Sequence, residues 1–416
     1  MKIAIIGAGI IGVTTAYELA ADGHEVHLFE RRNSACEETS FANAGVVSPG
    51  YVTPWAAPGM PSKVLKYIFQ KHAPVRIKLP FKHGELGWMS QWLKACKPAA
   101  YASTRSALQS LASYSAERLQ HLSKTLELEY DSAQGYMVLL RDAREFEHIQ
   151  ANLKILTDAG FAHKMLDGDA ARKIEPALST ATALHAAVHL PNDTVANCRQ
   201  FALLLREKAQ SLGAQFHFGT AVSHIQQGLQ GIQVHHDKVE AARAFDHVVI
   251  SAGVDSAALL KPLGIHIPLI PVYGYSVSAP VREPMDAPIS GVMDERYKVA
   301  ISRIGNRVRV AGSAEIGGDP NRINQSTIQT LYKVLDDWFP AAADTKGQTA
   351  NKGRGQVQVW KGARPMLPSG PPRVGASGVP GVWLNLGHGS SGWALACGSA
   401  RLLADKMMGQ KPTIDF

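Results

Sequence analysis

Apolar and polar residues are arranged along the first thirty positions in blocks that predict a strand, a glycine-rich turn, a helix and a second strand. Lys2–Ile6 is an apolar run typical of a buried strand, and it leads directly into the glycine-rich segment Gly7–Gly12. A helical pattern follows through Leu19, and a second apolar run, Glu25–Phe29, ends at the acidic Glu30. This order predicts a βαβ unit of a parallel sheet.

Similar patterns predict a helix-rich middle section and a second sheet. Residues 84–125 have apolar residues at helical spacing, and Phe146–Ala159 is a shorter predicted helix that ends at a glycine. A further helix is predicted over Thr327–Trp338, with Ser326 and Gln329 placed to form a capping box. The remaining predicted elements are the helices Cys198–Leu212 and Trp393–Met408 and the strands Gly135–Leu140, Gln215–Phe218, Ile232–His235, His247–Ile250, Pro268–Ala279, Val299–Ile304 and Arg307–Gly312, the last two joined as a hairpin at Asn306.

The order of these elements predicts two domains, of which the first is discontinuous. Around Pro191–Thr194 the chain is expected to return to the first domain. The small side chains of Ser251–Gly253 would let the backbone there approach a cofactor. The first domain is predicted to be of the α/β class, and the inserted domain to be α+β with a mixed or antiparallel sheet. The expected boundaries are residues 1–83, 190–265 and 345–416 for the first domain and residues 84–189 and 266–344 for the inserted domain.

The glycine spacing after the first strand is typical of a dinucleotide-binding site. Gly7 permits the tight turn, Gly9 lets the backbone approach a pyrophosphate, and Gly12 lets the helix pack closely on the strand. The following helix N-terminus offers unpaired N–H groups and a partial positive charge of about half a unit to the phosphates. Glu30 sits where such folds accept the ribose hydroxyls, and an acid there disfavours NADP. An ordinary glycine-rich turn would explain Gly7 but not Glu30.

Composition is that of a globular enzyme. The chain has 416 residues, 45% hydrophobic and 19% charged, which is enough for two domains and a large core. No run approaches the roughly twenty apolar residues that span a bilayer. Ile3–Val13 resembles a signal-peptide core, but cleavage there would remove the phosphate loop, so we expect an intracellular protein. The four cysteines lack metal-ligand spacing, and we expect structural thiols, no disulfide and no metal at Cys36, Cys96, Cys198 and Cys397.

The net charge of +8 favours anionic partners. No dense Lys/Arg run with interleaved aromatic residues occurs, so nucleic acid is not an expected partner. The most basic stretch is Lys63–Lys82, in which lysines and an arginine alternate with aromatic and aliphatic residues. This stretch is either a solvated helix face or a surface that docks on an anionic membrane.

Several longer segments, in addition to the glycine motif, are similar to those of a known protein family. The N-terminal motif, Asp246–Gly253 and the tail segment Leu384–Trp393 occur in the order found in FAD-dependent amine oxidoreductases. Over nearly its whole length the chain resembles the superfamily of D-amino-acid oxidase and glycine oxidase, and within it the bacterial D-amino-acid dehydrogenase small-subunit family. The resemblance implies a Rossmann-like FAD-binding domain with an inserted substrate domain. The segments that carry the closer resemblance are Ser40–Gly45, Ser48–Tyr51, Pro54–Gly59, Leu190–Asp193, Gly274–Ser276, Asp294–Glu295, Tyr297–Lys298, Arg364–Met366 and Trp393–Ser399.

The resemblance implies non-covalent FAD, held by the N-terminal motif, the Ser40–Gly45 loop and the glycine-rich tail loop. The tail loop would open a helix whose N-terminus faces the flavin pyrimidine edge and stabilises negative charge on the reduced ring. Ser40 and Asn43 could instead cap turns, and Cys397 is expected to be packed rather than linked to the flavin. The expected FAD-binding residues are Ile6, Gly7, Gly9, Ile10, Ile11, Gly12, Glu30, Arg31, Ser40, Asn43, Ala44, Gly45, Ala252, Gly253, Gly387, His388, Gly389, Ser390, Ser391 and Gly392.

For the substrate, the resemblance implies that Arg364 binds the carboxylate and that Tyr297 supplies a second contact. Arginine binds carboxylates in a bidentate fashion, and a charge-assisted bond contributes roughly 1.5–3 kcal/mol. Tyr51, Trp55 and Tyr275, together with these two residues, would form the substrate pocket. A structural ion pair is the alternative for Arg364, and ordinary core packing is the alternative for the aromatic residues.

The implied reaction is oxidative deamination of a D-amino acid to a 2-oxo acid and ammonia. Hydride would move from the α-carbon to the flavin, and electrons would pass to a quinone or another respiratory-chain acceptor. His388 is a candidate catalytic base, although it could equally position the loop backbone, and no base is required if the neutral amine reacts. The preference for D over L substrates rests on the resemblance alone. The expected location is cytoplasmic, with peripheral attachment to the inner face of the cell membrane as a further expectation.

Three other functions stay open. The first is an amine oxidase that acts on glycine, sarcosine, or D-proline or hydroxyproline with O2. The second is a non-catalytic flavoprotein subunit that docks through its basic face. An NAD-dependent dehydrogenase is the weakest alternative, because the tail loop Gly387–Gly392 would then lack a role.

Overall fold

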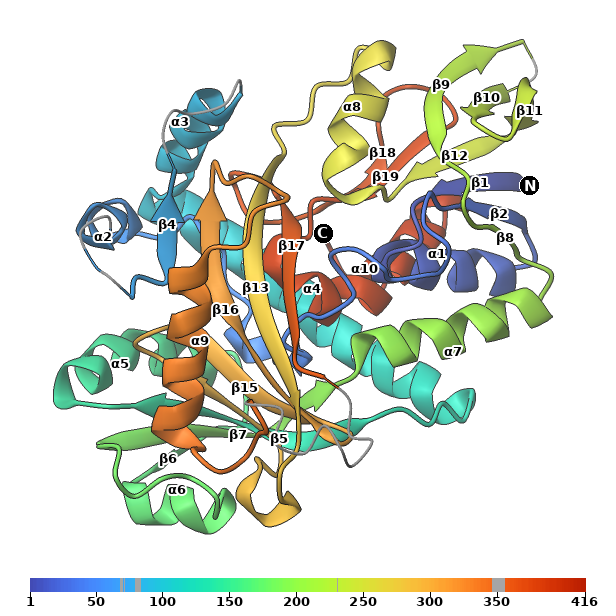
Figure 1. Cartoon of the computed structure of the whole chain (residues 1–416). Coiled ribbons are helices and arrows are strands. Elements are labelled where there is room, and N and C mark those ends of the chain that lie inside the picture. Colours follow the sequence, from blue (N-terminus) through green and yellow to red (C-terminus); the bar gives the residue numbers. More distant parts are fainter. Residues whose placement is uncertain (68–69, 71, 79–83, 230, 346–355) are drawn as a thin grey trace.

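Two large sheets organise the chain, as seen in the computed structural model (Figure 1). It describes residues 1–67, 70, 72–78, 84–229, 231–345 and 356–416. The first sheet has six strands, and its central strands are parallel. In spatial order these strands are β18 (Arg373–Ala376), β19 (Val382–Leu386), β12 (His247–Ile250), β1 (Lys2–Ile6), β2 (Glu25–Phe29) and β8 (Gln215–His217).

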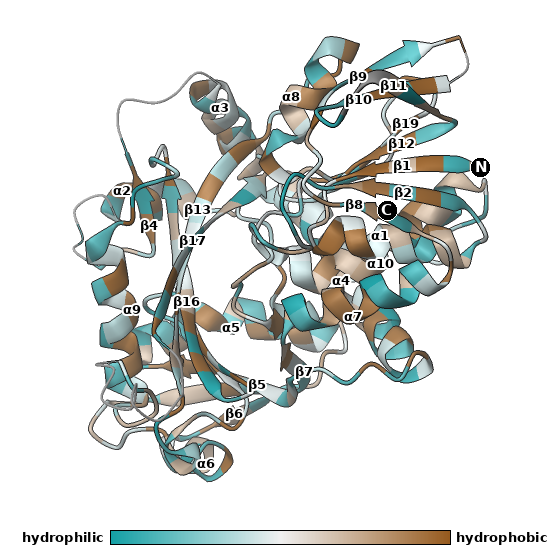
Figure 2. Ribbon diagram, turned by 45° about the vertical axis from the view of Figure 1, so that its right-hand side comes forward, coloured by the Kyte–Doolittle hydropathy of each residue, from teal (hydrophilic) through white to brown (hydrophobic). Residues whose placement is uncertain are grey.

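Both faces of this parallel sheet are buried, which explains the uninterrupted apolar runs in its strands. Ile3 and Ile5 pack against the helices α1 (Ile10–Ala21), α7 (Cys198–Ser211) and α10 (Gly392–Met407). Ala4 and Ile6 face the other way, into a core shared with a small three-stranded sheet. Figure 2 shows the central strands as a continuous hydrophobic layer. The small sheet consists of β9 (Val222–Gly228), β10 (Gly231–His236) and β11 (Val239–Phe245), next to α8 (Ser256–Leu260).

The second large sheet has ten strands and mixes parallel with antiparallel pairs. Its main path is β17 (Gln358–Met366), β13 (Ile270–Pro280), β16 (Arg307–Ile316), β15 (Val299–Ile304), β14 (Gly291–Asp294), β5 (Ser132–Leu140), β7 (Ala186–Ala196) and β3 (Val46–Val47), with β4 (Val75–Ile77) beside β16 and β6 (Lys164–Leu166) beside β7. The helix α9 (Gln325–Trp338) covers one face, where Leu331 and Trp338 pack on the sheet (Figure 1). The opposite face is free of α9. Because the Asn43–Gly45 loop, which is expected to bind FAD, contacts this face, we call it the cofactor-facing side.

Two predicted helical features differ in detail from the structure. The helical stretch predicted over 84–125 is divided into two helices, α3 (Glu85–Ala95) and α4 (Pro98–Thr125), because Pro98 starts a new first turn and cannot continue the preceding one. The capping box at Ser326 does not form, since α9 begins two residues earlier than predicted, with Asn324 as N-cap. The remaining helices are α2 (Met60–Tyr67), α5 (Ala143–Asp158) and α6 (Gly168–Ile174).

A buried charge joins three helices from distant parts of the chain. Glu18 of α1 has a fully buried side chain and accepts hydrogen bonds from Nε and Nη2 of Arg118, both at 2.7 Å. Arg401 of α10 donates to the same carboxylate from Nη1 at 3.1 Å. Arg118 lies in α4, so the carboxylate links this long helix to the helices that cover the parallel sheet.

Strand membership crosses the boundaries expected for the two domains. β7 continues in the ten-stranded sheet to Ala196, and β3, β4 and β17 belong to the same sheet although their residues were expected in the first domain. The chain joins the parallel-sheet layer with α7, directly after β7. The division into domains at the residues given above stays a prediction.

The basic stretch Lys63–Lys82 lies partly outside the described residues. Its described helical part belongs to α2, where Lys63, Leu65 and Lys66 are exposed and Val64 is buried. Within the described ranges, no helix is both long enough and apolar enough to cross a membrane.

Candidate cofactor and substrate site

At two of the N-terminal glycines the neighbouring backbone leaves no room for a side chain. Gly7 has a φ of +103°, and a Cβ on it would lie 2.7 Å from the carbonyl oxygen of Ser251. A Cβ on Gly12 would lie 1.8 Å from the carbonyl oxygen of Gly7, so a side chain there would push α1 off the strand. Gly9 is the N-cap of α1 and provides no side-chain cap. The first turn of α1 is therefore packed tightly on β1, and its N-cap residue leaves the first N–H groups to other partners.

Polar groups from two following segments surround this helix N-terminus. The Glu30 carboxylate, directly after β2, accepts hydrogen bonds from the backbone N–H of Ala8 at 2.7 Å and of Arg32 at 2.8 Å. Ser40 Oγ accepts one from the N–H of Ile10 at 3.1 Å, so this hydroxyl does cap a helix turn, the alternative considered for it. Arg31 is paired with Glu38 and Asp255, and these carboxylates raise its pKa.

A cavity of about 380 Å³ lies between the N-terminal motif, the 251–259 segment and the tail loop. It brings together fourteen of the twenty predicted FAD-binding residues, namely Ile6, Gly7, Gly9, Ile10, Ile11, Glu30, Arg31, Ser40, Ala252, Gly253, Gly387, His388, Gly389 and Gly392. Lining residues that the sequence did not single out as binding residues include Phe29, Cys36, Glu37, Glu38, Thr39, the 220–223 segment, Asp255, Pro365 and Asn385. Most of these residues directly follow or precede predicted motifs, so their position next to a motif is the feature by which the sequence could have identified them.

The chemistry of the cavity fits a dinucleotide. Two lining atoms, Ser251 Oγ and Asn385 Oδ1, are buried without a hydrogen-bond partner among the described residues. Unpaired buried polar atoms are costly, so they indicate groups that a ligand satisfies. The N-terminus of α1 lies at the cavity, and the turn Gly389–Ser391 leads into α10 at its other end. Helix N-termini favour negative charge, as on a pyrophosphate or a reduced flavin.

The remaining six predicted cofactor residues are not among the residues that line this cavity. The Asn43–Gly45 loop contacts the cofactor-facing side of the ten-stranded sheet. The carbonyl of Asn43 accepts from Nη1 of Arg309 at 3.1 Å, and that of Ala44 accepts from Oγ of Ser302 at 3.0 Å. Asn43 Oδ1 also accepts from the N–H of Gly45 at 2.9 Å, which is turn capping. Gly12 is buried, whereas Ser390 and Ser391 lie in the turn before α10.

Arg364 lies on the cofactor-facing side of β17. Its Nη1 donates to the carbonyl oxygen of Ser313 at 2.7 Å, and its guanidinium extends over Gly274 of the neighbouring strand β13. No carboxylate of the described residues pairs with it, so the structural ion pair considered as an alternative is not formed in this part of the chain. Burial lowers the pKa of Arg364 to about 10, and the group is still charged at neutral pH. The residue is thus a cation held by a neutral oxygen.

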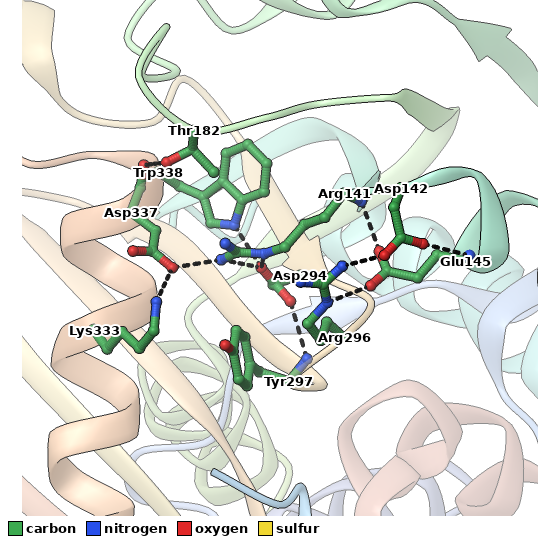
Figure 3. Close-up of polar contacts among 10 residues, drawn as sticks. All are labelled: Arg141, Asp142, Glu145, Thr182, Asp294, Arg296, Tyr297, Lys333, Asp337 and Trp338. Carbon is green, nitrogen blue, oxygen red and sulfur yellow. Dashed lines mark hydrogen bonds and ion pairs between the residues drawn. The ribbon is translucent and has the colours of Figure 1, made fainter.

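The structure does not bring Tyr297 next to Arg364. The Tyr297 ring lies 5.2 Å from the guanidinium carbon of Arg141 and 5.5 Å from Nζ of Lys333, beside α9 (Figure 3). Its backbone N–H donates to the buried Asp294, which also accepts from Arg141 and from Trp338. In this structure Tyr297 is part of a charged network on the α9 side of the sheet. Its expected contact with the substrate carboxylate stays a prediction that this placement does not favour.

The other three predicted pocket residues are spread over separate environments. Tyr51 donates its hydroxyl hydrogen bond to Glu295 and packs in the cluster around Tyr136. Trp55 packs near Trp88 and Met366. Tyr275 is 1% exposed and belongs to the core under α9, on the face opposite Gly274. Ordinary packing, the alternative for these aromatic residues, describes Tyr275 in this structure.

His388 lines the cavity but its ring is buried. One ring nitrogen, Nε2, lies 3.0 Å from Oγ of Ser399 inside α10. Burial lowers the pKa of His388 to about 3, so the imidazole stays neutral at physiological pH. This placement favours positioning of the tail loop over proton transfer, and a catalytic role for His388 stays an untested prediction. Cys397 is buried in the same helix, as are the thiols of Cys36, Cys96 and Cys198.

Comparison with known proteins identifies this architecture. The family model described as "FAD dependent oxidoreductase" (DAO) matches residues 2–406. The chain belongs to this family. It is 40% identical to a D-amino acid dehydrogenase of Allorhizobium ampelinum over 419 aligned residues, which cover all of this chain and 96% of the relative. The expected membership, fold class and FAD dependence are confirmed.

Solved structures of two oxidases have the same fold. Glycine oxidase from Geobacillus kaustophilus matches with a TM-score of 0.75 at 20% identity, covering 100% of this chain and 96% of the oxidase. An L-α-glycerophosphate oxidase from Mycoplasma pneumoniae, solved with FAD bound, matches with a TM-score of 0.70 at 16% identity over 100% of this chain and 95% of that enzyme. FAD is the cofactor of this family, and the lining of the cavity described above fits its dinucleotide.

Proposed function

We propose that this protein is a D-amino-acid dehydrogenase, which oxidises D-amino acids to 2-oxo acids and ammonia and passes the electrons to a quinone or another respiratory-chain acceptor. The observation that carries the proposal is Arg364, whose partly buried guanidinium has a carbonyl oxygen rather than a carboxylate as its partner in the described chain. A substrate carboxylate would supply the missing negative charge. The full-length relationship to proteins named D-amino acid dehydrogenase supports the same substrate class.

FAD, when bound, supplies the acceptor for the hydride that leaves the substrate α-carbon. Arg364 would hold the carboxylate, and its anchor at Ser313 would fix the orientation of the α-carbon. No described side chain beside Arg364 is an evident base. His388 is neutral and hydrogen-bonded to Ser399, so we propose that the neutral amine of the substrate reacts without a protein base.

The first test is anaerobic reduction of the purified flavoprotein. D-Alanine, D-proline, glycine, sarcosine and the available L-enantiomers are mixed with it in turn, and the visible flavin band is followed. Bleaching by D-amino acids and not by their L-enantiomers is expected. Bleaching by glycine or sarcosine alone would move the protein to the amine-oxidase alternative, and no bleaching by any of them would favour a non-catalytic flavoprotein subunit.

Arg364→Ala tests the carboxylate site. The loss of one or two charge-assisted hydrogen bonds is expected to raise KM for D-alanine about 10- to 100-fold or more, while FAD stays bound. Arg144→Ala, which removes an exposed arginine of α5, is the matched control and should leave KM unchanged. Loss of FAD from the Arg364 variant with normal substrate affinity in the remaining holoenzyme would contradict the assignment.

Glycine oxidase activity is the second candidate, and the structural similarity to glycine oxidase is the observation that favours it. Formation of hydrogen peroxide in air during turnover separates the two activities. A dehydrogenase forms little peroxide and is reoxidised by a soluble quinone analogue under nitrogen. Peroxide formed in proportion to substrate consumed would support the oxidase.

For the cellular location, we propose peripheral attachment to the inner face of the cell membrane through α2. Lys63 and Lys66 are exposed there next to Leu65, which is 63% exposed, so the helix offers both charge and an apolar contact. Vesicles with and without anionic phosphatidylglycerol test this proposal in a flotation assay. Binding to anionic vesicles that the double variant Lys63→Glu/Lys66→Glu loses is expected, and equal binding by both proteins would contradict it.

A further inference from the structure

Two glycines lie side by side on the cofactor-facing side of the ten-stranded sheet. Gly274 of β13 is paired directly with Gly362 of β17. Neither has a positive φ, so their backbone conformation would accept any residue. What they provide is space, and we call the depression that they leave in the sheet surface the glycine trough.

Two large side chains occupy the glycine trough. A Cβ on Gly274 would lie 2.3 Å from Nη2 of Arg364 and 2.5 Å from its Cζ. A Cβ on Gly362 would lie 1.7 Å from Cη2 of Trp360 and 2.3 Å from its Cζ2. The indole and the guanidinium therefore each lie directly on the backbone of one glycine. Any side chain at either glycine would displace the group above it.

The alternation of β17 explains why these groups lie on the same face of the sheet. Trp360, Gly362 and Arg364 are separated by two positions each, so their side chains leave the strand on the same face. Directly opposed residues in an antiparallel pair have Cα atoms about 4.5–5.5 Å apart. The space over Gly362, which holds the indole, is thus next to the space over Gly274, which holds the guanidinium. The indole can therefore limit where the guanidinium lies.

Hydrogen bonding alone does not fix the Arg364 side chain. Within the described chain its guanidinium makes one hydrogen bond, to the carbonyl oxygen of Ser313. That carbonyl is presented by a bulge in β16, where Ser313 has a φ of +62°. One hydrogen bond alone does not fix the plane of the guanidinium, whereas bidentate binding of a carboxylate needs that plane to be defined.

We propose that Trp360 is a positioning residue for Arg364: its indole fills one half of the glycine trough and confines the guanidinium to the other half, ready to bind a carboxylate. The inference rests on the proposed role of Arg364 in substrate binding. It adds a residue that acts through the arginine without itself touching the reacting atoms.

The test measures carboxylate binding separately from catalysis. Benzoate serves as a non-reactive carboxylate, and its Kd is obtained from the change it causes in the flavin spectrum of the holoenzyme. Trp360→Ala is expected to raise this Kd about tenfold, with kcat for D-alanine changed less than KM. Trp360→Phe should restore most of the affinity, because a flat ring still fills the space. Gly362→Ala, which displaces the indole, should resemble Trp360→Ala.

A double-mutant cycle distinguishes positioning from a general structural role. In an Arg364→Ala background, Trp360→Ala should have no further effect on benzoate affinity. Additive effects, or an unchanged Kd in Trp360→Ala, would overturn the proposal. Gly87→Ala is the control for glycine substitution, because a Cβ there meets nothing within 4 Å. If Trp360→Ala does not fold, Trp360→Phe and Gly362→Ala carry the test.

Failure of the proposed function has a different signature. If no amino acid reduces the wild-type flavin while benzoate still binds and the cycle still shows coupling, the positioning role stands and the substrate class is wrong. If D-alanine reduces the flavin and the cycle shows no coupling, the substrate class stands and the role of Trp360 is wrong.

Discussion

Asp193 is a buried carboxylate whose titration should be visible in the stability of the protein. It lies in β7, 7% exposed, and accepts a hydrogen bond from Ser48 just after the Asn43–Gly45 loop. Burial raises its pKa from 3.8 to about 6, and the hydrogen bond from Ser48 opposes this rise in part. At neutral pH the folded protein therefore carries a carboxylate that would be more stable in the unfolded chain.

The free energy of unfolding should depend on pH, because the folded and unfolded states bind a proton at Asp193 with different affinity. Between pH 4 and 6 the folded state holds a proton on Asp193 that the unfolded state has released, so the free energy of unfolding falls as the pH rises through this window. The loss is nearly complete at pH 7, about one unit above the pKa of the folded state. At about 1.4 kcal/mol per pKa unit, the difference between 3.8 and about 6 corresponds to a loss of about 3 kcal/mol.

Asp193→Asn removes the titration while keeping an oxygen that can accept from Ser48. Thermal unfolding is measured at saturating FAD from pH 4 to pH 8, with Asp158→Asn, an exposed carboxylate of α5, as the control. The Tm of the Asp193 variant relative to wild type is expected to rise by a few degrees between pH 4 and pH 7 and to stay level above that. A difference in Tm that is constant over the whole range would refute the reasoning.

Two further predictions concern the helix that follows the first strand. Gly12→Ala would place a Cβ 1.8 Å from the Gly7 carbonyl oxygen, so the purified variant is expected to lose most of its flavin, and full flavin content would contradict the packing argument. Glu18→Gln would leave the mostly buried Arg118 and Arg401 without their shared carboxylate, at a cost of about 3 kcal/mol measured by thermal unfolding at saturating FAD. An unchanged Tm would contradict this expectation, because it would show that other partners or solvent replace the lost interaction of the two arginines with the carboxylate.

Elements with a dense apolar pattern could be predicted from the sequence, some to the residue. The predicted strands Glu25–Phe29, His247–Ile250 and Val299–Ile304 have the observed bounds, because consecutive or alternating branched residues leave little choice of ends. β17 was not predicted as a strand. Its residues, QVWKGARPM, contain glycine, proline and charges, and only pairing with β13 makes them extended. Local pattern is weak where a partner strand decides the conformation.

The cofactor end of the site could be predicted better than the substrate end for a related reason. The N-terminal residues act through a continuous strand, turn and helix, so their spacing in sequence fixes their geometry. Tyr275 and Gly274 are sequence neighbours, yet they lie on opposite faces of β13, and the sequence prediction did not establish which face is toward the cofactor. Arg309 and Trp360 gave no signal, because only strand pairing brings them to the cofactor-facing side.

Charge distribution distinguishes the two ends of the site and bears on what each binds. At the nucleotide end, Arg31 and Arg32 are paired with Glu38. On the cofactor-facing side of the ten-stranded sheet, Arg307, Arg309 and Arg364 have only neutral oxygen partners among the described residues. Burial lowers the pKa of all three, so folding alone does not favour these charges. A surface of this kind is most stable when an anion joins it, as the carboxylate of an amino acid would.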